Sequence, residues 1–107
     1  MESKDLVFVG FNKRAAALDR RSGQIVWKWR ASQGSGYVSL LLDREFLFAA
    51  VNGYTYCLDP RTGEELWQNP MNGFGHGVTS MATVSGHTDH GVLQEVARAA
   101  AAAAAAS

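Results

Sequence analysis

The sequence predicts an all-β fold made from two copies of one strand–turn–strand unit. Residues 58–67 repeat residues 18–27 at a spacing of 40 positions, with a Leu, an Asp, a Ser or Thr, a Gly and a Trp at matching places. The flanking residues 34–39 return as residues 75–80, now 41 positions further on. A period close to 40 residues with strand-like content is typical of β-propeller blades and similar repeats.

Each copy contains a turn whose residue types indicate its geometry. The Asp can accept hydrogen bonds from backbone N–H groups two or three residues further on, which closes the turn. The Gly follows where the chain must leave the turn with a positive φ, a conformation that glycine adopts without a steric penalty. The Trp is large enough to anchor a contact between two sheets. The residues predicted to define the repeat are Asp19, Gly23, Trp27, Asp59, Gly63 and Trp67.

The first set of strands begins with Leu6–Phe11, a nearly continuous apolar run that is typical of a strand covered on both faces. After a short turn, residues 15–19 form a second strand that ends in the Asp turn. Residues 24–30 form a third, with Ile25, Trp27 and Trp29 expected on one face because side chains alternate along a strand. A polar loop with two Gly follows, and residues 37–42 form the fourth strand.

The cycle then restarts. Phe46–Val51 repeats the first strand, and Asn52-Gly53 is a strong signal for a two-residue hairpin. Three further strands are expected, and between the last two lies a loop rich in Gly and Asn. These strands are residues 54–59, 64–69 and 78–84. The sequence thus predicts eight strands in two sets of four.

The chain divides into a repeat domain, residues 1–84, and an Ala-rich tail or helix, residues 85–107. Residues 99–106 are all Ala, the best intrinsic helix former. A flexible tail, a docking helix and an expression artefact are all compatible with this composition.

Charge and cysteine content exclude several classes of function. Ten basic and ten acidic residues give a net charge of zero, so neither nucleic acid nor a membrane is an expected partner. The single Cys57 cannot form an internal disulfide, and its apolar strand context predicts a buried, inert thiol. The apolar run near the N-terminus is too short for a signal peptide, so a cytoplasmic location is expected.

The pattern Ala-x-Asp-x-x-Ser/Thr-Gly-x-x-x-Trp, which begins at Ala17 and recurs from Cys57, resembles the quinoprotein-type (PQQ-like) β-propeller repeats. The resemblance covers residues 5–84. It implies four-stranded blades in which the Trp docks neighbouring blades together. Members of that family include quinone-dependent alcohol dehydrogenases and periplasmic assembly scaffolds. This chain has one Cys and no clustered Asp or Glu in the matching context, so no cofactor is expected.

The order of the strands predicts how a ring of blades would close. With blade strands lettered A (inner) to D (outer), the chain starts at B, passes through one complete blade and ends on A. Propellers need about four to eight blades, so two cannot close a ring. We therefore expect residues 78–84 of one subunit to pair beside Leu6–Phe11 of the next in a head-to-tail homo-oligomer. A tetramer with eight blades is favoured and a trimer with six comes next; a fragment of a longer propeller is the alternative.

One face of this ring is the predicted ligand face. The turns between strands B and C and the loops between D and A surround one mouth of the central channel in such a fold. Solvated loops without a ligand are the other interpretation. The residues placed on this face are Asn12, Lys13, Arg14, Asn52, Tyr54, Asn72, Phe74 and His76.

No catalytic or metal site is predicted. The sequence has no Gly-x-Ser-x-Gly elbow, phosphate loop, Cys-x-x-Cys pair or paired-carboxylate motif. His87, Asp89 and His90 have metal-binding side chains, but zinc needs three or four ligands in fixed geometry, so the start of a helix is the preferred interpretation.

These observations favour a non-enzymatic oligomeric β-propeller that acts as a binding or scaffold module for a protein or small-molecule ligand. One alternative is a cofactor-binding or quinone-dependent site that forms only in the assembled channel. Another is a membrane-protein assembly factor.

Overall fold

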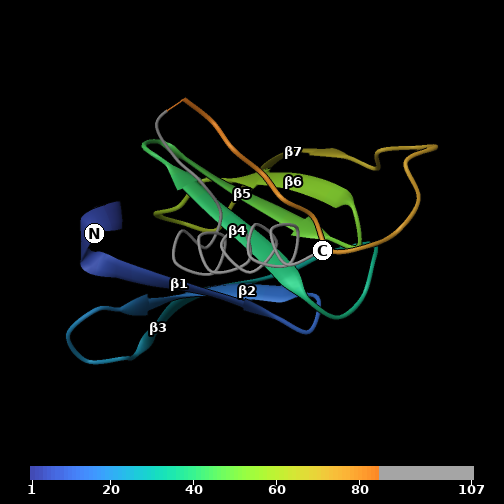
Figure 1. The fold of residues 1–107 in the computed structure, drawn as a ribbon. Coiled ribbons are helices and arrows are strands. Elements are labelled where there is room, and N and C mark those ends of the chain that lie inside the picture. The colour runs from blue at the N-terminus through green and yellow to red at the C-terminus, as the bar shows by residue number, and fades with distance from the viewer. Residues whose placement is uncertain (85–107) are drawn as a thin grey trace, which may run out of the picture.

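The computed structural model describes residues 1–84 and consists of antiparallel strands after one turn of 3-10 helix (Figure 1). All seven strands are joined to their sequence neighbours by short turns or loops. Their bounds are η1 Ser3–Asp5, β1 Leu6–Phe11, β2 Arg14–Asp19, β3 Ile25–Arg30, β4 Val38–Asp43, β5 Phe46–Val51, β6 Tyr54–Leu58 and β7 Glu65–Asn69. Each of these strands agrees with a predicted one to within a residue at either end.

The strands form two sheets in chain order. Strands β1-β2-β3 make a three-stranded sheet and β4-β5-β6-β7 a four-stranded sheet, and every pairing is antiparallel. Figure 1 shows the two sheets stacked, the three-stranded one in blue and the four-stranded one in green and yellow. This is the predicted phase of strands B–C–D followed by A–B–C–D, so the all-β, blade-like architecture is confirmed.

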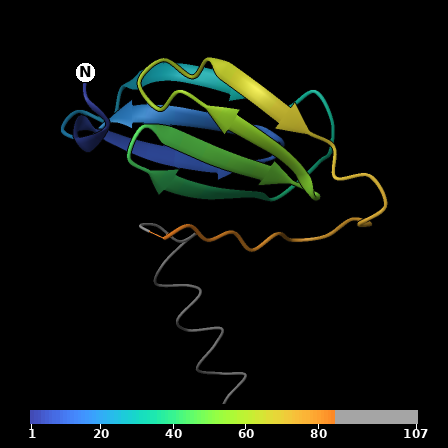
Figure 2. The ribbon, with the colours of Figure 1, turned by 90° about the horizontal axis from the view of Figure 1, so that it is seen from above.

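Within the described residues the two sheets hold seven of the eight predicted strands, and the predicted eighth strand, residues 78–84, belongs to neither sheet. The first sheet has three strands, and residues 78–84 are extended but contain only an isolated bridge at Ala82. Figure 2 shows this segment, in orange, running alongside the four-stranded sheet. The segment contacts β4, where Ser39 Oγ donates to the backbone oxygen of Thr79 at 2.6 Å.

A bulge in each sheet alters the predicted alternation of side chains. In the first sheet, Ala17 lies opposite Trp27 but Leu18 lies opposite Ile25, which leaves Val26 as an extra residue. Ile25 is therefore 58% exposed while Trp27 and Trp29 are buried, and the three residues do not share one buried face as predicted. The second sheet has the same irregularity beside Leu58.

The core lies between the two sheets. Trp29 meets Tyr56 edge to face with ring centroids 4.8 Å apart, and Trp27 lies against Phe8 at 6.2 Å. Small residues at the centre of β2 let the two sheets approach closely. The buried cluster comprises Leu6, Ala15, Ala17, Trp27, Trp29, Ala31, Val38, Leu47, Ala49, Val51, Tyr56 and Leu58.

Two predictions concern residues outside the part of the chain that the structure describes. These are the Ala-rich tail or helix at residues 85–107 and the polar segment with His87, Asp89 and His90. Among residues 1–84, no helix is long and apolar enough to cross a membrane.

Candidate binding face and blade contacts

The two Asp turns have the same pattern of hydrogen bonds, as the repeat predicts. Asp59 Oδ1 accepts from the backbone N–H of Arg61 at 2.9 Å, and Asp19 Oδ1 accepts from that of Arg21 at 2.8 Å. Each Asp backbone oxygen also accepts from the Gly N–H four residues on, at 2.8 Å in both turns. Both glycines have a positive φ, +76° at Gly23 and +78° at Gly63. The predicted roles of Asp and Gly are therefore confirmed.

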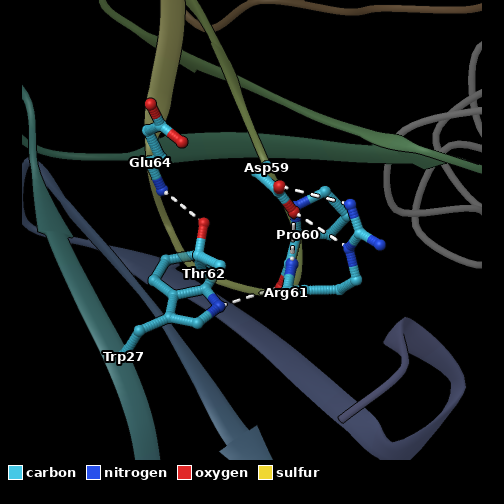
Figure 3. Close-up of polar contacts among 6 residues, drawn as sticks. All are labelled: Trp27, Asp59, Pro60, Arg61, Thr62 and Glu64. Atoms are coloured by element: carbon cyan, nitrogen blue, oxygen red, sulfur yellow. Dashed lines mark hydrogen bonds and ion pairs between the residues drawn. The ribbon is translucent and has the colours of Figure 1, made fainter.

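Asp59 carries an additional ionic contact. Its carboxylate accepts from Arg61 Nε at 3.3 Å, beside the bond from the Arg61 backbone (Figure 3). The backbone N–H of Arg61, and then its side chain, hold the pKa of Asp59 below its usual value. The carboxylate is thus stabilised in the charged form that closes the turn.

Trp27 docks on the second turn. Its Nε1 donates to the backbone oxygen of Pro60 at 2.8 Å (Figure 3). The ring lies over Gly63, where an added Cβ would come within 2.5 Å of Trp27 Cε3. Trp29 adds a bond from its Nε1 to Glu65 Oε1 at 3.1 Å. Trp27 therefore joins the two sheets and is 8% exposed.

The equivalent residues of the other repeat are not joined in this way. Trp67 is 47% exposed. At Gly23, an added Cβ would have no neighbour within 4 Å. The repeat predicts an anchoring role for both Trp residues, and within residues 1–84 only Trp27 fills it.

The predicted ligand face begins at the loop 31–37, which lies between two hairpin turns. On one side Lys13 N donates to the oxygen of Gly36 at 2.8 Å, and Ala31 N donates to the oxygen of Lys13 at 2.9 Å. On the other side Gly34 packs so closely that an added Cβ would lie 2.7 Å from the Val51 oxygen. Asn52 Nδ2 reaches Ser35 Oγ at 3.5 Å. The two B–C turns and the loop between them thus form one continuous rim.

The second part of the rim surrounds an open depression of about 320 Å³. Its lining includes Phe74 and His76 from the loop 70–77 and Gly53 from the β5–β6 turn. The His76 ring lies 6.0 Å from that of Tyr54, and Phe74 is 78% exposed. The Phe74 ring and the His76 imidazole therefore line a shallow hollow that a side chain of a ligand could enter.

The structure groups most of the predicted face residues at two places along this rim. Asn12, Lys13 and Arg14 lie at the first turn, where Arg14 Nη1 donates to the Asn12 oxygen at 3.0 Å. The Asn52–Tyr54 turn meets the loop that carries Phe74 and His76 at the second place. Asn72 is exposed in that same loop.

Sequence reasoning missed the residues that hold the rim in place. The Tyr56 hydroxyl accepts from Gln33 N at 3.0 Å and donates to the Gln33 oxygen at 3.1 Å. Tyr56 looks like an ordinary apolar strand residue, and no local motif marks it. Its position on β6, where it packs against Trp29 of the first sheet, brings its hydroxyl to the loop.

The side chains that could coordinate a metal ion do not cluster in the described part of the chain. Among residues 1–84, no three His, Cys, Asp or Glu side chains gather to form a metal site. Cys57 is free and fully buried, and burial raises the pKa of its thiol, as expected for an inert cysteine.

A family model described as outer membrane protein assembly factor BamB, built on PQQ-like repeats, matches residues 1–102. The chain belongs to the PQQ-like repeat family. Among curated proteins, none matches the chain. Membership in the PQQ-like family accounts for the paired Asp turns and for the docking of Trp27, and the resemblance read from the sequence is confirmed.

Proposed function

We propose that this PQQ-like protein is a non-enzymatic binding or scaffold module whose binding face is the rim described above. The observation that supports it best is the depression beside Tyr54 and His76, with Phe74 exposed at its border. Exposed aromatic side chains near hydrogen-bonding groups are typical of recognition surfaces. The cytoplasm, which the sequence predicts, is the proposed location.

The charge along the rim suggests the class of ligand. The rim segments 12–14, 31–37, 52–54 and 70–77 contain Lys13 and Arg14 but no Asp or Glu. An acidic ligand is therefore attracted to one end of the rim, while the Phe74 ring offers an apolar contact at the other. A peptide with an acidic residue and an aromatic or aliphatic anchor fits both ends.

The proposal includes assembly into a ring from several copies of the chain, with a tetramer favoured over a trimer. Each copy would contribute one rim, so a ring presents several equivalent binding faces on the same side. Multivalent presentation raises the apparent affinity for a ligand that spans two faces. A scaffold role follows from such repetition.

Selection from a random peptide library displayed on phage tests the binding face. We expect enriched peptides to carry acidic and aromatic residues, and to lose at least tenfold in affinity on Phe74→Ala and on Lys13→Ala/Arg14→Ala. Lys4→Ala/Lys28→Ala removes the same charge outside the rim and is the matched control. Peptides that bind all variants equally would reject the rim as the binding face.

A cofactor role is the competing interpretation. It predicts that pyrroloquinoline quinone with Ca²⁺ changes the fluorescence of the Trp residues in the assembled protein. The binding module predicts no saturable change in the same titration.

The family description favours a second candidate, a factor in membrane-protein assembly. The two candidates differ in compartment, since an outer membrane assembly factor works in the cell envelope. Cell fractionation separates them: recovery with the cytoplasm supports the proposed module, and recovery with the envelope supports the assembly factor.

A further inference from the structure

We propose that Trp67 of one copy docks on the Asp19–Gly23 turn of a second copy, and that residues 78–84 of the first copy complete the second copy's three-stranded sheet. The result is a composite blade built from two chains. This inference rests on the oligomeric module proposed above and identifies its contacts.

The Trp residue that would dock has the same neighbours within its sheet in both repeats. In the first sheet, Phe8, Ala17 and Trp27 lie in one cross-strand row, and their positions correspond to Phe48, Cys57 and Trp67 in the second. The two Phe–Trp ring pairs have nearly the same geometry, with centroids 6.2 and 6.0 Å apart and interplanar angles of 42° and 45°. Trp67 therefore has the orientation within its sheet that Trp27 uses for docking.

The turn that would receive the Trp ring also occurs twice in the chain. The Asp19 turn has the same backbone bonds and nearly the same φ at its Gly as the Asp59 turn that holds Trp27. The space over Gly23 is open, whereas the indole ring fills it over Gly63. By the spacing of the repeat, the Arg20 oxygen corresponds to the Pro60 oxygen that Trp27 Nε1 binds. In the described part of each copy, one open turn at Gly23 and one exposed Trp at position 67 therefore remain.

Within residues 1–84, these two features of one chain do not meet each other. Trp27 points from the first sheet toward the second, so its counterpart Trp67 points from the second sheet away from the first. The Asp19 turn belongs to the first sheet. We therefore assign the contact between Trp67 and such a turn to another copy, in a head-to-tail arrangement.

The extended segment 78–84 supports the same arrangement independently. Thr79, Met81 and Thr83 are half-buried while the residues between them are exposed, which is the alternation of a strand with one covered face. Thr79 lies over β4, bonded to Ser39, which pairs with Ala50.

The contact of residues 78–84 with the second sheet resembles the contact of β4, the preceding inner strand, with the first sheet. A Cβ added at Gly10 of β1, the position that corresponds to Ala50, would lie 3.0 Å from Val38 of β4. Residues 78–84 thus occupy the place of an inner strand for a further blade. The strands that would complete that blade are β1, β2 and β3 of the second copy.

The three-stranded sheet has room for such a strand. Within residues 1–84, β1 pairs only with β2, and an open groove of about 460 Å³ lies between β1 and β4. Its lining is mostly apolar and consists of Phe8, Val9, Gly10, Tyr37, Val38, Leu40, Leu42 and Leu47. An unpaired edge beside an apolar groove is a site for strand addition.

The register of this pairing is taken from the equivalent strands of the four-stranded sheet. Leu42 lies opposite Leu47 in the β4–β5 ladder. Their counterparts by the repeat are Thr83 and Val7. In a Cys57→Ala background, Val7→Cys/Thr83→Cys is expected to form disulfides between chains, and the Val7→Cys/Val84→Cys control, shifted by one residue, much fewer. Equal cross-linking of the two pairs would overturn the strand addition.

The docking contact is tested by solution mass and circular dichroism of full-length variants. Trp67→Ala and Gly23→Ala are each expected to stay folded and to lose assembly. Phe74→Ala removes another exposed aromatic residue, and Gly36→Ala introduces a Cβ at nearly the same φ, +78°, in equally open space. Both controls are expected to keep the wild-type mass.

An equal mixture of Trp67→Ala and Gly23→Ala gives the decisive result. The Gly23→Ala chain retains Trp67 and the Trp67→Ala chain retains an open socket, so the mixture is expected to contain heterodimers that neither variant forms alone.

Retention of the wild-type assembly by both variants would overturn the docking contact and leave the binding module standing. A wild-type mass of one chain would overturn the second copy as the occupant and assign this face to residues 85–107 or to a different partner. Loss of peptide binding by Phe74→Ala is scored separately, so failure of the rim is distinguishable from failure of the contact.

Discussion

Trp27 and Gly63 belong to different sheets, and the indole ring occupies the space that a Cβ at Gly63 would need. The added atom would lie 2.5 Å from Cε3 and 2.6 Å from Cδ2 of Trp27. Real Cβ contacts of this length do not occur, so a side chain at this position must displace the Trp. The glycine is therefore required by tertiary packing as well as by its φ of +78°.

The first prediction concerns this pair. Gly63→Ala is expected to lower the free energy of unfolding by about 1–3 kcal/mol from overpacking, in addition to about 1–2 kcal/mol from the left-handed backbone. In a Trp27→Leu background, which lacks the indole ring, only the backbone part should remain. Urea unfolding of the four proteins measures the coupling. Equal costs of Gly63→Ala in both backgrounds would show that the ring is not the obstacle.

The second prediction concerns the rim. Tyr56→Phe removes the hydroxyl that both accepts from and donates to the Gln33 backbone, and leaves those groups without their partner. We expect a cost of about 1–3 kcal/mol and faster hydrogen exchange in the loop 31–37. Tyr37→Phe, at a half-exposed ring, is the control and should change neither quantity. Unchanged exchange in Tyr56→Phe would mean that the hydroxyl does not anchor the loop.

The sequence predicts the turns well because their geometry is local. Asp59 bonds to residues two and four positions away, and Gly63 needs a positive φ that few other residues adopt. The hairpin at Asn52-Gly53 likewise depends only on neighbouring residues, and both have a positive φ. Such features recur at the same spacing in each copy, which makes the repeat visible.

Other features depend on contacts that no local pattern encodes. Trp27 and Trp67 occupy equivalent positions, yet only Trp27 has a second sheet to dock on within the described residues. Residues 78–84 have strand-like composition, yet within the described part of the chain they show an isolated bridge at Ala82 rather than a ladder. The hydrogen bonds of Tyr56 join β6 to Gln33 in the loop 31–37, far away in the sequence, so they could not be found from local spacing.

The third prediction concerns Cys57, whose place in the first repeat is taken by Ala17. Because both residues are fully buried at equivalent positions, Cys57→Ala is expected to cost less than about 1.5 kcal/mol. Cys57→Leu adds volume to a closed site and should cost about 1–3 kcal/mol. The native thiol should react with a thiol reagent only as fast as the protein opens. Immediate modification of the folded protein would contradict the buried position.

The fourth prediction concerns pH. Because the folded pKa of Asp59 is lowered, its contribution is complete above the unfolded value of about 3.9 and is lost as the pH falls through the folded pKa. Asp59→Asn should therefore be less stable than wild type at pH 7, and the difference should shrink below about pH 4. Arg61→Gln should reduce the same difference, since its side chain contributes to the shift. A difference that stays constant down to pH 3 would rule out the charged carboxylate as its cause.

The central claim is that copies of this chain complete one another's blades, and the mass of the wild-type protein in solution tests it most directly. Light scattering behind size exclusion should give a multiple of the 11.6 kDa chain, with four chains favoured and three next. A single, well-folded species with the mass of one chain would contradict it.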